Sequence, residues 1–133
     1  MTSYPTLAAV LVVLAGSVGC EPTTIVNCPD PGFAGIGIWL EDSVTGLGLH
    51  GRRGEAVATD GTFSDTVRFE IHPAAYSKVA LANNRPGTYT VTVTAEGYVP
   101  WPQSGVRVLE DPRPCYTVVT TWLTARMQPM PTP

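Results

Sequence analysis

Strict two-residue alternation in residues 85–101, RPGTYTVTVTAEGYVPW, constrains the fold more than any other feature of the chain. After the turn signal Pro86-Gly87, apolar side chains alternate with threonines. The apolar members are Tyr89, Val91, Val93 and Ala95. Successive side chains of a strand point to opposite faces, so the pattern predicts a strand with one buried face and one threonine face in solvent. Gly97-Tyr98 is predicted to close this strand.

The rest of the chain divides into similar short segments separated by turn residues. Thirteen glycines and thirteen prolines accompany abundant Thr and Val, a composition typical of short strands joined by turns. Residues 74–82 are compatible with either a short helix or a strand. About seven strands with turn signals every 8–12 residues or so predict an all-β, antiparallel sandwich. The strands are expected within residues 34–42, 55–61, 62–71, 85–101, 105–110 and 115–127.

Low charge argues against a nucleic-acid partner. Only 14% of the residues are charged and the net charge is −3, so the chain lacks the basic patch that nucleic-acid binding requires. The single adjacent pair of basic residues, Arg52-Arg53, lies between glycines in a predicted loop. The body of the chain contains no apolar run long enough for an internal membrane span.

The N-terminus has the pattern of a targeting signal. Residues 7–18, LAAVLVVLAGSV, form an apolar run that is too short to span a bilayer comfortably and has the length of a signal-peptide core. The small residues Ser17 and Gly19 precede Cys20. This arrangement resembles a bacterial lipoprotein signal.

The lipoprotein resemblance implies where the protein resides. Residues 1–19 would be a cleaved signal-peptide helix, Cys20 would be acylated, and residues 20–27 would tether the domain to the membrane. Glu21 after the cysteine favours the outer membrane of the cell envelope. The leader carries no Lys or Arg, so ordinary cleavage with secretion, or a retained buried segment, stay open as alternatives.

The two remaining cysteines, Cys28 and Cys115, are predicted to form a disulfide. Export places the chain in an oxidising compartment, where two such thiols usually pair. The bridge would enclose almost the whole predicted domain, and an odd number of cysteines is what one lipid-bearing cysteine plus one bridge gives. A metal site is disfavoured because no C-x₂-C spacing occurs and His50 and His72 are isolated.

Two segments resemble a known family. Residues 39–49, WLEDSVTGLGL, contain D-x-x-T-G-x-x-L, and residues 60–65 with 85–98 contain a Gly-x-Tyr strand that ends in Gly-Tyr. Together they resemble carboxypeptidase regulatory-like domains, which are transthyretin-like β-sandwiches. The resemblance covers residues 28–127 and implies a non-catalytic module; the H-x-x-E motif of the associated peptidases does not occur. Residues 128–133, QPMPTP, are expected to be a disordered tail.

No enzymatic activity, cofactor or metal is predicted. The chain has no G-x-S-x-G motif, and neither histidine has a cysteine or a pair of carboxylates near it in sequence. Four carboxylates could bind calcium if their turns met, since hard cations prefer oxygen ligands. The favoured alternative is that they cap the backbone of their own turns. These residues are Glu41, Asp42, Asp60 and Asp65.

Four aromatic residues are candidates for an exposed binding surface: Trp39, Tyr98, Trp101 and Tyr116. Exposed apolar patches mark interaction sites. The alternative is that these side chains pack under loops, with Tyr98 closing one end of the sandwich and Trp122 in or beside the core. We therefore predict a structural or binding module of the cell envelope, with an envelope protein or a glycan as partner. Carbohydrate or peptide binding through the aromatics is the alternative function, and a small hydrolase is the least favoured.

Overall fold

The computed structural model describes residues 26–28 and 32–133. The predicted signal peptide, residues 1–19, and the predicted lipidation site, Cys20, lie outside these residues. The described residues contain eight strands and no helix. The strands are β1 (Ile36–Asp42), β2 (Arg53–Asp60), β3 (Phe63–Glu70), β4 (Lys78–Leu81), β5 (Gly87–Ala95), β6 (Trp101–Glu110), β7 (Val118–Val119) and β8 (Thr121–Met127).

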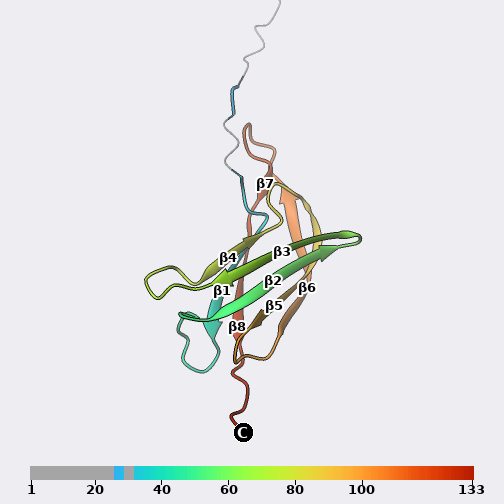
Figure 1. Cartoon of the computed structure of the whole chain (residues 1–133). Coiled ribbons are helices and arrows are strands. Elements are labelled where there is room, and N and C mark those ends of the chain that lie inside the picture. Colours follow the sequence, from blue (N-terminus) through green and yellow to red (C-terminus); the bar gives the residue numbers. More distant parts are fainter. Residues whose placement is uncertain (1–25, 29–31) are drawn as a thin grey trace, which may run out of the picture.

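The strands form two facing sheets, which confirms the predicted all-β sandwich (Figure 1). One sheet has the order β4-β1-β8 and the other the order β3-β2-β5-β6-β7. Every neighbouring pair of strands is antiparallel except β1 and β8, which run parallel. The prediction of a wholly antiparallel sandwich is therefore wrong for one edge of the smaller sheet.

The parallel pair arises because the chain changes sheets between β7 and β8. β7 pairs with β6, whereas β8 pairs with β1 of the opposite sheet. At the crossing, the hydroxyl of Thr120 donates a hydrogen bond to the carbonyl of Ala34, 2.6 Å away, and the amide of Thr121 donates to the carbonyl of Gly35. The single strand predicted over residues 115–127 is thus two strands.

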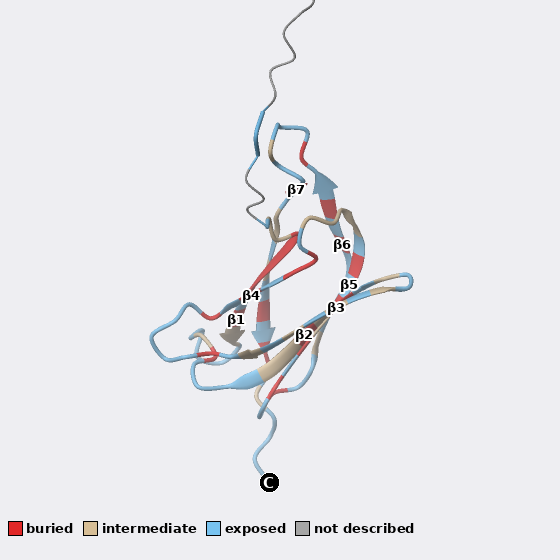
Figure 2. Ribbon diagram, turned by 45° about the horizontal axis from the view of Figure 1, so that its top comes forward, coloured by how far each residue is buried: buried red, intermediate tan, exposed pale blue. Residues whose placement is uncertain are grey.

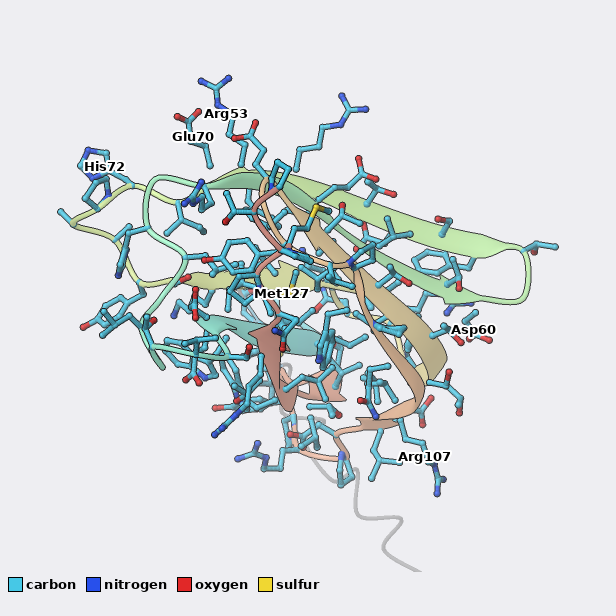
Figure 3. The ribbon with its side chains drawn as sticks, turned by 90° about the horizontal axis from the view of Figure 1, so that it is seen from below. Arg53, Asp60, Glu70, His72, Arg107 and Met127 are labelled. Carbon is cyan, nitrogen blue, oxygen red and sulfur yellow. A yellow bond between two sulfur atoms is a disulfide. The ribbon has the colours of Figure 1, made fainter. Side chains whose placement is uncertain are left out.

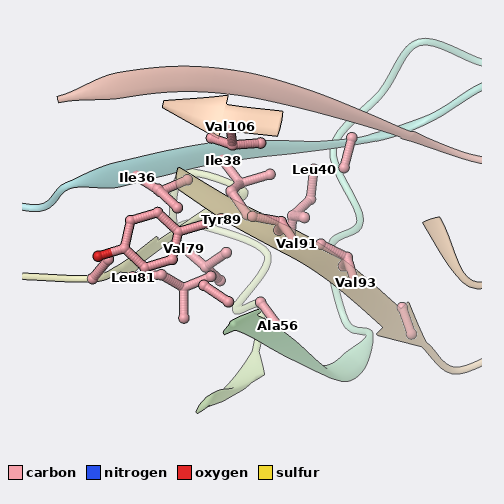
Figure 4. Close-up of a cluster of buried hydrophobic side chains, with 14 of the residues drawn as sticks. Ile36, Ile38, Leu40, Ala56, Val79, Leu81, Tyr89, Val91, Val93 and Val106 are labelled. Carbon is pink, nitrogen blue, oxygen red and sulfur yellow. The ribbon is translucent and has the colours of Figure 1, made fainter. Parts of the chain in front are cut away.

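The hydrophobic core lies between β1 and β5 (Figure 4). Tyr89, Val91 and Val93 of β5 are buried, as their alternation predicts, and they face the apolar side of β1. On that strand Ile36, Ile38 and Leu40 are completely buried. Figure 2 shows buried positions alternating with exposed ones along the strands, which is the expected pattern for a sandwich.

A polar contact fixes the β2–β3 hairpin to the start of β5. Gly61 follows Asp60 at the turn with φ +58°, a conformation that glycine adopts at little cost. Arg85 Nη1 lies 3.0 Å from Asp60 Oδ2 and donates to the hydroxyl of Tyr89, which in turn donates to the carbonyl of Arg85. A tyrosine hydroxyl bound to backbone a few residues upstream is the tyrosine corner of sandwich folds.

Two segments differ in extent from the sequence prediction. Of residues 74–82, compatible with helix or strand, only Lys78–Leu81 form strand β4, because Val79 and Leu81 alternate into the core and the strand pairs with β1. The predicted disordered tail is tied to the domain by its first residues. The amide of Val99 donates to the carbonyl of Gln128, and that of Met130 donates to the carbonyl of Gly97.

The Cys28–Cys115 disulfide is present, as predicted. It joins the segment that precedes β1 to the loop between β6 and β7, with the two Cα atoms 5.0 Å apart. A disulfide is typical of chains that reside in an oxidising, extracytoplasmic compartment.

Candidate functional site

Three aromatic side chains gather on the outer surface of the smaller sheet, which we call the aromatic face: Trp39, Tyr76 and Trp122. Their exposed fractions are 37%, 77% and 54%. The indoles of Trp39 and Trp122 are stacked, with centroids 5.7 Å apart and planes 25° apart. The ring of Tyr76 meets Trp39 edge-on at 6.4 Å. This is an exposed aromatic cluster, in which each ring contacts another while remaining open to solvent.

The register of β1 and β8 creates the indole pair. The side chains of Ile38 and Leu40 point into the core, so positions 37 and 39 belong to the outer face of β1, where the Trp39 side chain points outwards. The parallel register sets Trp122 directly beside Gly37. A Cβ atom at residue 37 would collide with the six-membered ring of Trp122, so the glycine leaves the space in which that indole lies next to Trp39.

Lys78, the single lysine of the chain, completes the aromatic face. It pairs with Trp39 in the β1–β4 register. Its Nζ lies 5.6 Å from the centroid of Trp39 and 5.7 Å from that of Tyr76, within the range of cation–π attraction. The ammonium group therefore helps to hold Tyr76, which lies in the loop before β4, against the sheet.

A cleft of about 490 Å³ adjoins the aromatic face and shares Trp39 and Tyr76 with it. Its polar side chains come from separate segments: Glu41 from β1, His50 from the β1–β2 loop and Ser77 from the segment before β4. A carboxylate accepts hydrogen bonds, and a neutral imidazole both donates and accepts them. The cleft thus offers polar partners beside an aromatic wall.

The cleft does not assemble a catalytic triad. The buried hydroxyl of Ser77 accepts a hydrogen bond from the amide of Leu49 at 3.0 Å, which gives it a structural role. No hydrogen bond joins the side chains of Glu41, His50 and Ser77 in the described part of the chain, whereas a nucleophile needs a base within hydrogen-bonding reach.

Tyr98 does not belong to an exposed surface, contrary to its inclusion among the candidates. It is buried, and its hydroxyl donates a hydrogen bond of 2.8 Å to Asp42 Oδ2. Burial, followed by the hydrogen bond to Asp42, raises the pKa of Tyr98. The alternative interpretation, that Tyr98 closes one end of the sandwich, agrees with this position.

Asp42 organises the turn after β1. Its Oδ1 atom accepts hydrogen bonds from the amides of Val44 and Thr45, at 2.8 and 2.9 Å. Gly46 follows with φ +70°, as the turn requires. The Thr45 amide, the Tyr98 hydroxyl and the Val44 amide together lower the pKa of Asp42. Asp42 is therefore a turn-capping residue.

The other two aromatic candidates lie apart from Trp39. Trp101 begins β6 of the larger sheet, where it is partly buried against the core. Tyr116 is exposed in the β6–β7 loop, stacked on Phe33 at 4.8 Å beneath the guanidinium of Arg113. The four predicted residues therefore form no common surface.

Trp122 was expected in or beside the core, and this prediction is wrong. Ala125 and Met127 are the buried residues of β8, so Trp122 points outwards together with Thr124 and Arg126. The sequence indicates this direction, because in a strand Trp122 lies on the same side as the polar residues Thr124 and Arg126. The outward direction of Trp122 was not predicted because the chain changes sheets at Thr120, and the sequence does not show which strand β8 pairs with.

The carboxylates considered for calcium are occupied separately. Asp60 pairs with Arg85, Asp65 accepts the amide of Ala82 at 2.7 Å, and Asp42 caps its turn. Within residues 26–28 and 32–133, no group of three or more His, Cys, Asp or Glu side chains could hold a metal ion. These three carboxylates serve the backbone and the hairpin, and the fourth, Glu41, lines the cleft.

The larger sheet carries paired charges away from the aromatic face. Arg53 and Glu70 project side by side from β2 and β3, with Nε and Oε2 3.2 Å apart (Figure 3). His72 follows β3 at the strand end, and its Nδ1 accepts a hydrogen bond from the amide of Ala74. Neither feature contributes to the cleft.

Comparison with known proteins assigns no family: the chain matches no protein-family model and no curated protein. No helix of the described ranges is long and apolar enough to cross a bilayer.

Proposed function

We propose that the protein is a non-catalytic binding module of the cell envelope. In this proposal the chain is exported, acylated at Cys20, and folded into a transthyretin-like sandwich of the carboxypeptidase regulatory-like kind. The lipoprotein-like leader and the Cys28–Cys115 disulfide support export. The aromatic face carries the binding role.

The rings of the aromatic face do not contribute to the hydrophobic core, so core packing does not explain why these positions are aromatic. Ile38, Leu40 and Ala125 fill the inner side of the same sheet and are completely buried. Trp39 and Trp122 lie on the opposite side and expose large areas of indole to water. Because burying aromatic surface is strongly favourable, a cluster of exposed and mutually contacting rings is best explained by a ligand that covers it.

Binding through this face is tested by retention of the mature domain on broad glycan and peptide arrays. We expect the wild-type protein to be retained and Trp122→Ala to bind at least about tenfold more weakly, because one half of the indole pair is lost. Tyr116→Ala is the matched control, since it removes an exposed ring at the disulfide end of the domain. Its retention should equal that of the wild type. A wild-type domain that neither array retains would contradict the binding role.

The anchor is tested separately by mass spectrometry of the protein purified from its native envelope. We expect the mature chain to begin at Cys20, with a mass that includes acyl chains. Acylation would give stable attachment, since each buried CH₂ group contributes about 0.8 kcal/mol. An N-terminus at another residue, or an unmodified Cys20, would refute the anchor without affecting the argument for the aromatic face.

A further inference from the structure

We infer that the aromatic face and the adjoining cleft bind a neutral carbohydrate chain. This inference rests on the proposed binding function and names the ligand class of the same site. It depends on three features: the stacked indoles, the polar groups of the cleft, and the paired backbone of β1.

The stacked indoles suit the apolar faces of sugar rings. A pyranose presents C–H groups on its faces, and these groups carry slight positive charge that is attracted to the negative face of an aromatic ring. Trp39 and Trp122 lie with their planes 25° apart and remain 37% and 54% exposed. A sugar ring could therefore pack against the part of the indole surface that the stacking and Lys78 leave open, which is larger on Trp122 than on Trp39.

The cleft supplies partners for the hydroxyl groups. Each hydroxyl of a sugar both donates and accepts hydrogen bonds, and it loses water when the ring stacks on an indole. Glu41 and His50 line the cleft beside Trp39, which belongs to both the cleft and the aromatic face. A sugar chain that covers the indoles would thus reach a carboxylate and an imidazole.

The backbone beneath Trp39 is closed to an extended peptide that would bind as an added strand. Peptides commonly bind by adding a strand to an open sheet edge. β1 is the central strand of its sheet and pairs with β4 on one side and β8 on the other, so the backbone under Trp39 is already occupied and a peptide could add only at the β4 or β8 edge. The Glu41 carboxylate of the cleft and the Lys78 ammonium of the aromatic face carry opposite charges, so the site as a whole favours neither an anion nor a cation.

The inference is tested by following the indole N–H resonances of the mature protein by NMR. The chain has three tryptophans, so Trp39 and Trp122 report on the site and Trp101 serves as an internal control. The probes are cellohexaose, xylohexaose, maltohexaose and chitohexaose, with a library of unstructured decapeptides as the alternative. We expect at least one oligosaccharide to shift Trp39 and Trp122 while leaving Trp101 unchanged.

Variants connect the shifts to the site. For the oligosaccharide that binds, Trp122→Ala should weaken the affinity at least about tenfold. Glu41→Gln should weaken it about threefold to tenfold, as expected when a hydrogen bond to a carboxylate becomes a weaker one to a neutral amide. Tyr116→Ala should bind like the wild type. An unchanged Trp101 resonance in each variant shows that the fold is intact.

The outcomes separate this inference from the function on which it rests. Peptides that shift Trp39 and Trp122 when no oligosaccharide does would overturn the carbohydrate assignment and uphold the binding module. Oligosaccharide binding that survives Trp122→Ala would also overturn the assignment. Failure of every sugar and every peptide to shift these two resonances would reject both proposals.

Discussion

Reduction of the Cys28–Cys115 disulfide is expected to lower the free energy of unfolding by about 4.5 kcal/mol. The two residues are 87 positions apart, so the bridge removes a large amount of conformational freedom from the unfolded chain. Small domains have only about 5–15 kcal/mol of stability in total, so the loss would be a large fraction. The hydrophobic core between β1 and β5 does not include the bridge, and we expect the reduced domain to fold with a much lower stability.

Urea unfolding of the mature domain with and without a reducing agent measures this effect. The reductant should move the midpoint of the wild type to lower urea concentration. The double variant Cys28→Ser/Cys115→Ser should resemble the reduced wild type and should not respond to the reductant. Equal midpoints for the oxidised and reduced wild type would show that the bridge does not contribute to stability.

Adjacent substitutions in β1 should have opposite consequences. Ile38→Ala is expected to destabilise the domain by about 3–4 kcal/mol, because Ile38 is 0% exposed and its removal leaves a cavity against β5. Trp39→Ala should cost less, about 1–2 kcal/mol, since the side chain is partly exposed and loses only its surface contacts with Trp122, Tyr76 and Lys78.

Chemical denaturation of the two variants under identical conditions gives the comparison. The predicted order also decides whether variants of the aromatic face can be interpreted as binding variants, because a folded Trp39→Ala protein is required for that purpose. A larger loss of stability for Trp39→Ala than for Ile38→Ala would mean that the indole pair is structural.

Local sequence patterns predicted the parts of the fold in which one segment decides its own conformation. The alternation in residues 85–101 identified the buried face of β5, and the neighbouring segments 55–61 and 62–71 identified β2 and β3. Residues 34–42 identified β1 and the outward direction of Trp39. The disulfide was predicted from the expected oxidising compartment and from the two cysteines that remain besides Cys20. In these cases the period of a strand and the turn preference of glycine suffice.

The features that the sequence did not predict depend on contacts between distant segments. The parallel pairing of β1 with β8 requires the chain to change sheets at Thr120, and no local sequence pattern predicts this change. The aromatic face depends on that pairing, because Trp122 reaches Trp39 only through the space left by Gly37. The cleft brings together Glu41 and His50 with residues before β4, so its composition follows from the tertiary fold alone.

The central claim, that a ligand covers the aromatic face in the envelope, is tested most directly by hydroxyl-radical footprinting. The labelling of Trp39, Trp122 and Tyr116 would be compared between the purified protein and the protein in its native envelope. We predict that Trp39 and Trp122 are labelled readily when purified and are protected in the envelope, whereas Tyr116 is labelled equally in both. Equal labelling of Trp39 and Trp122 in the two preparations would contradict the claim.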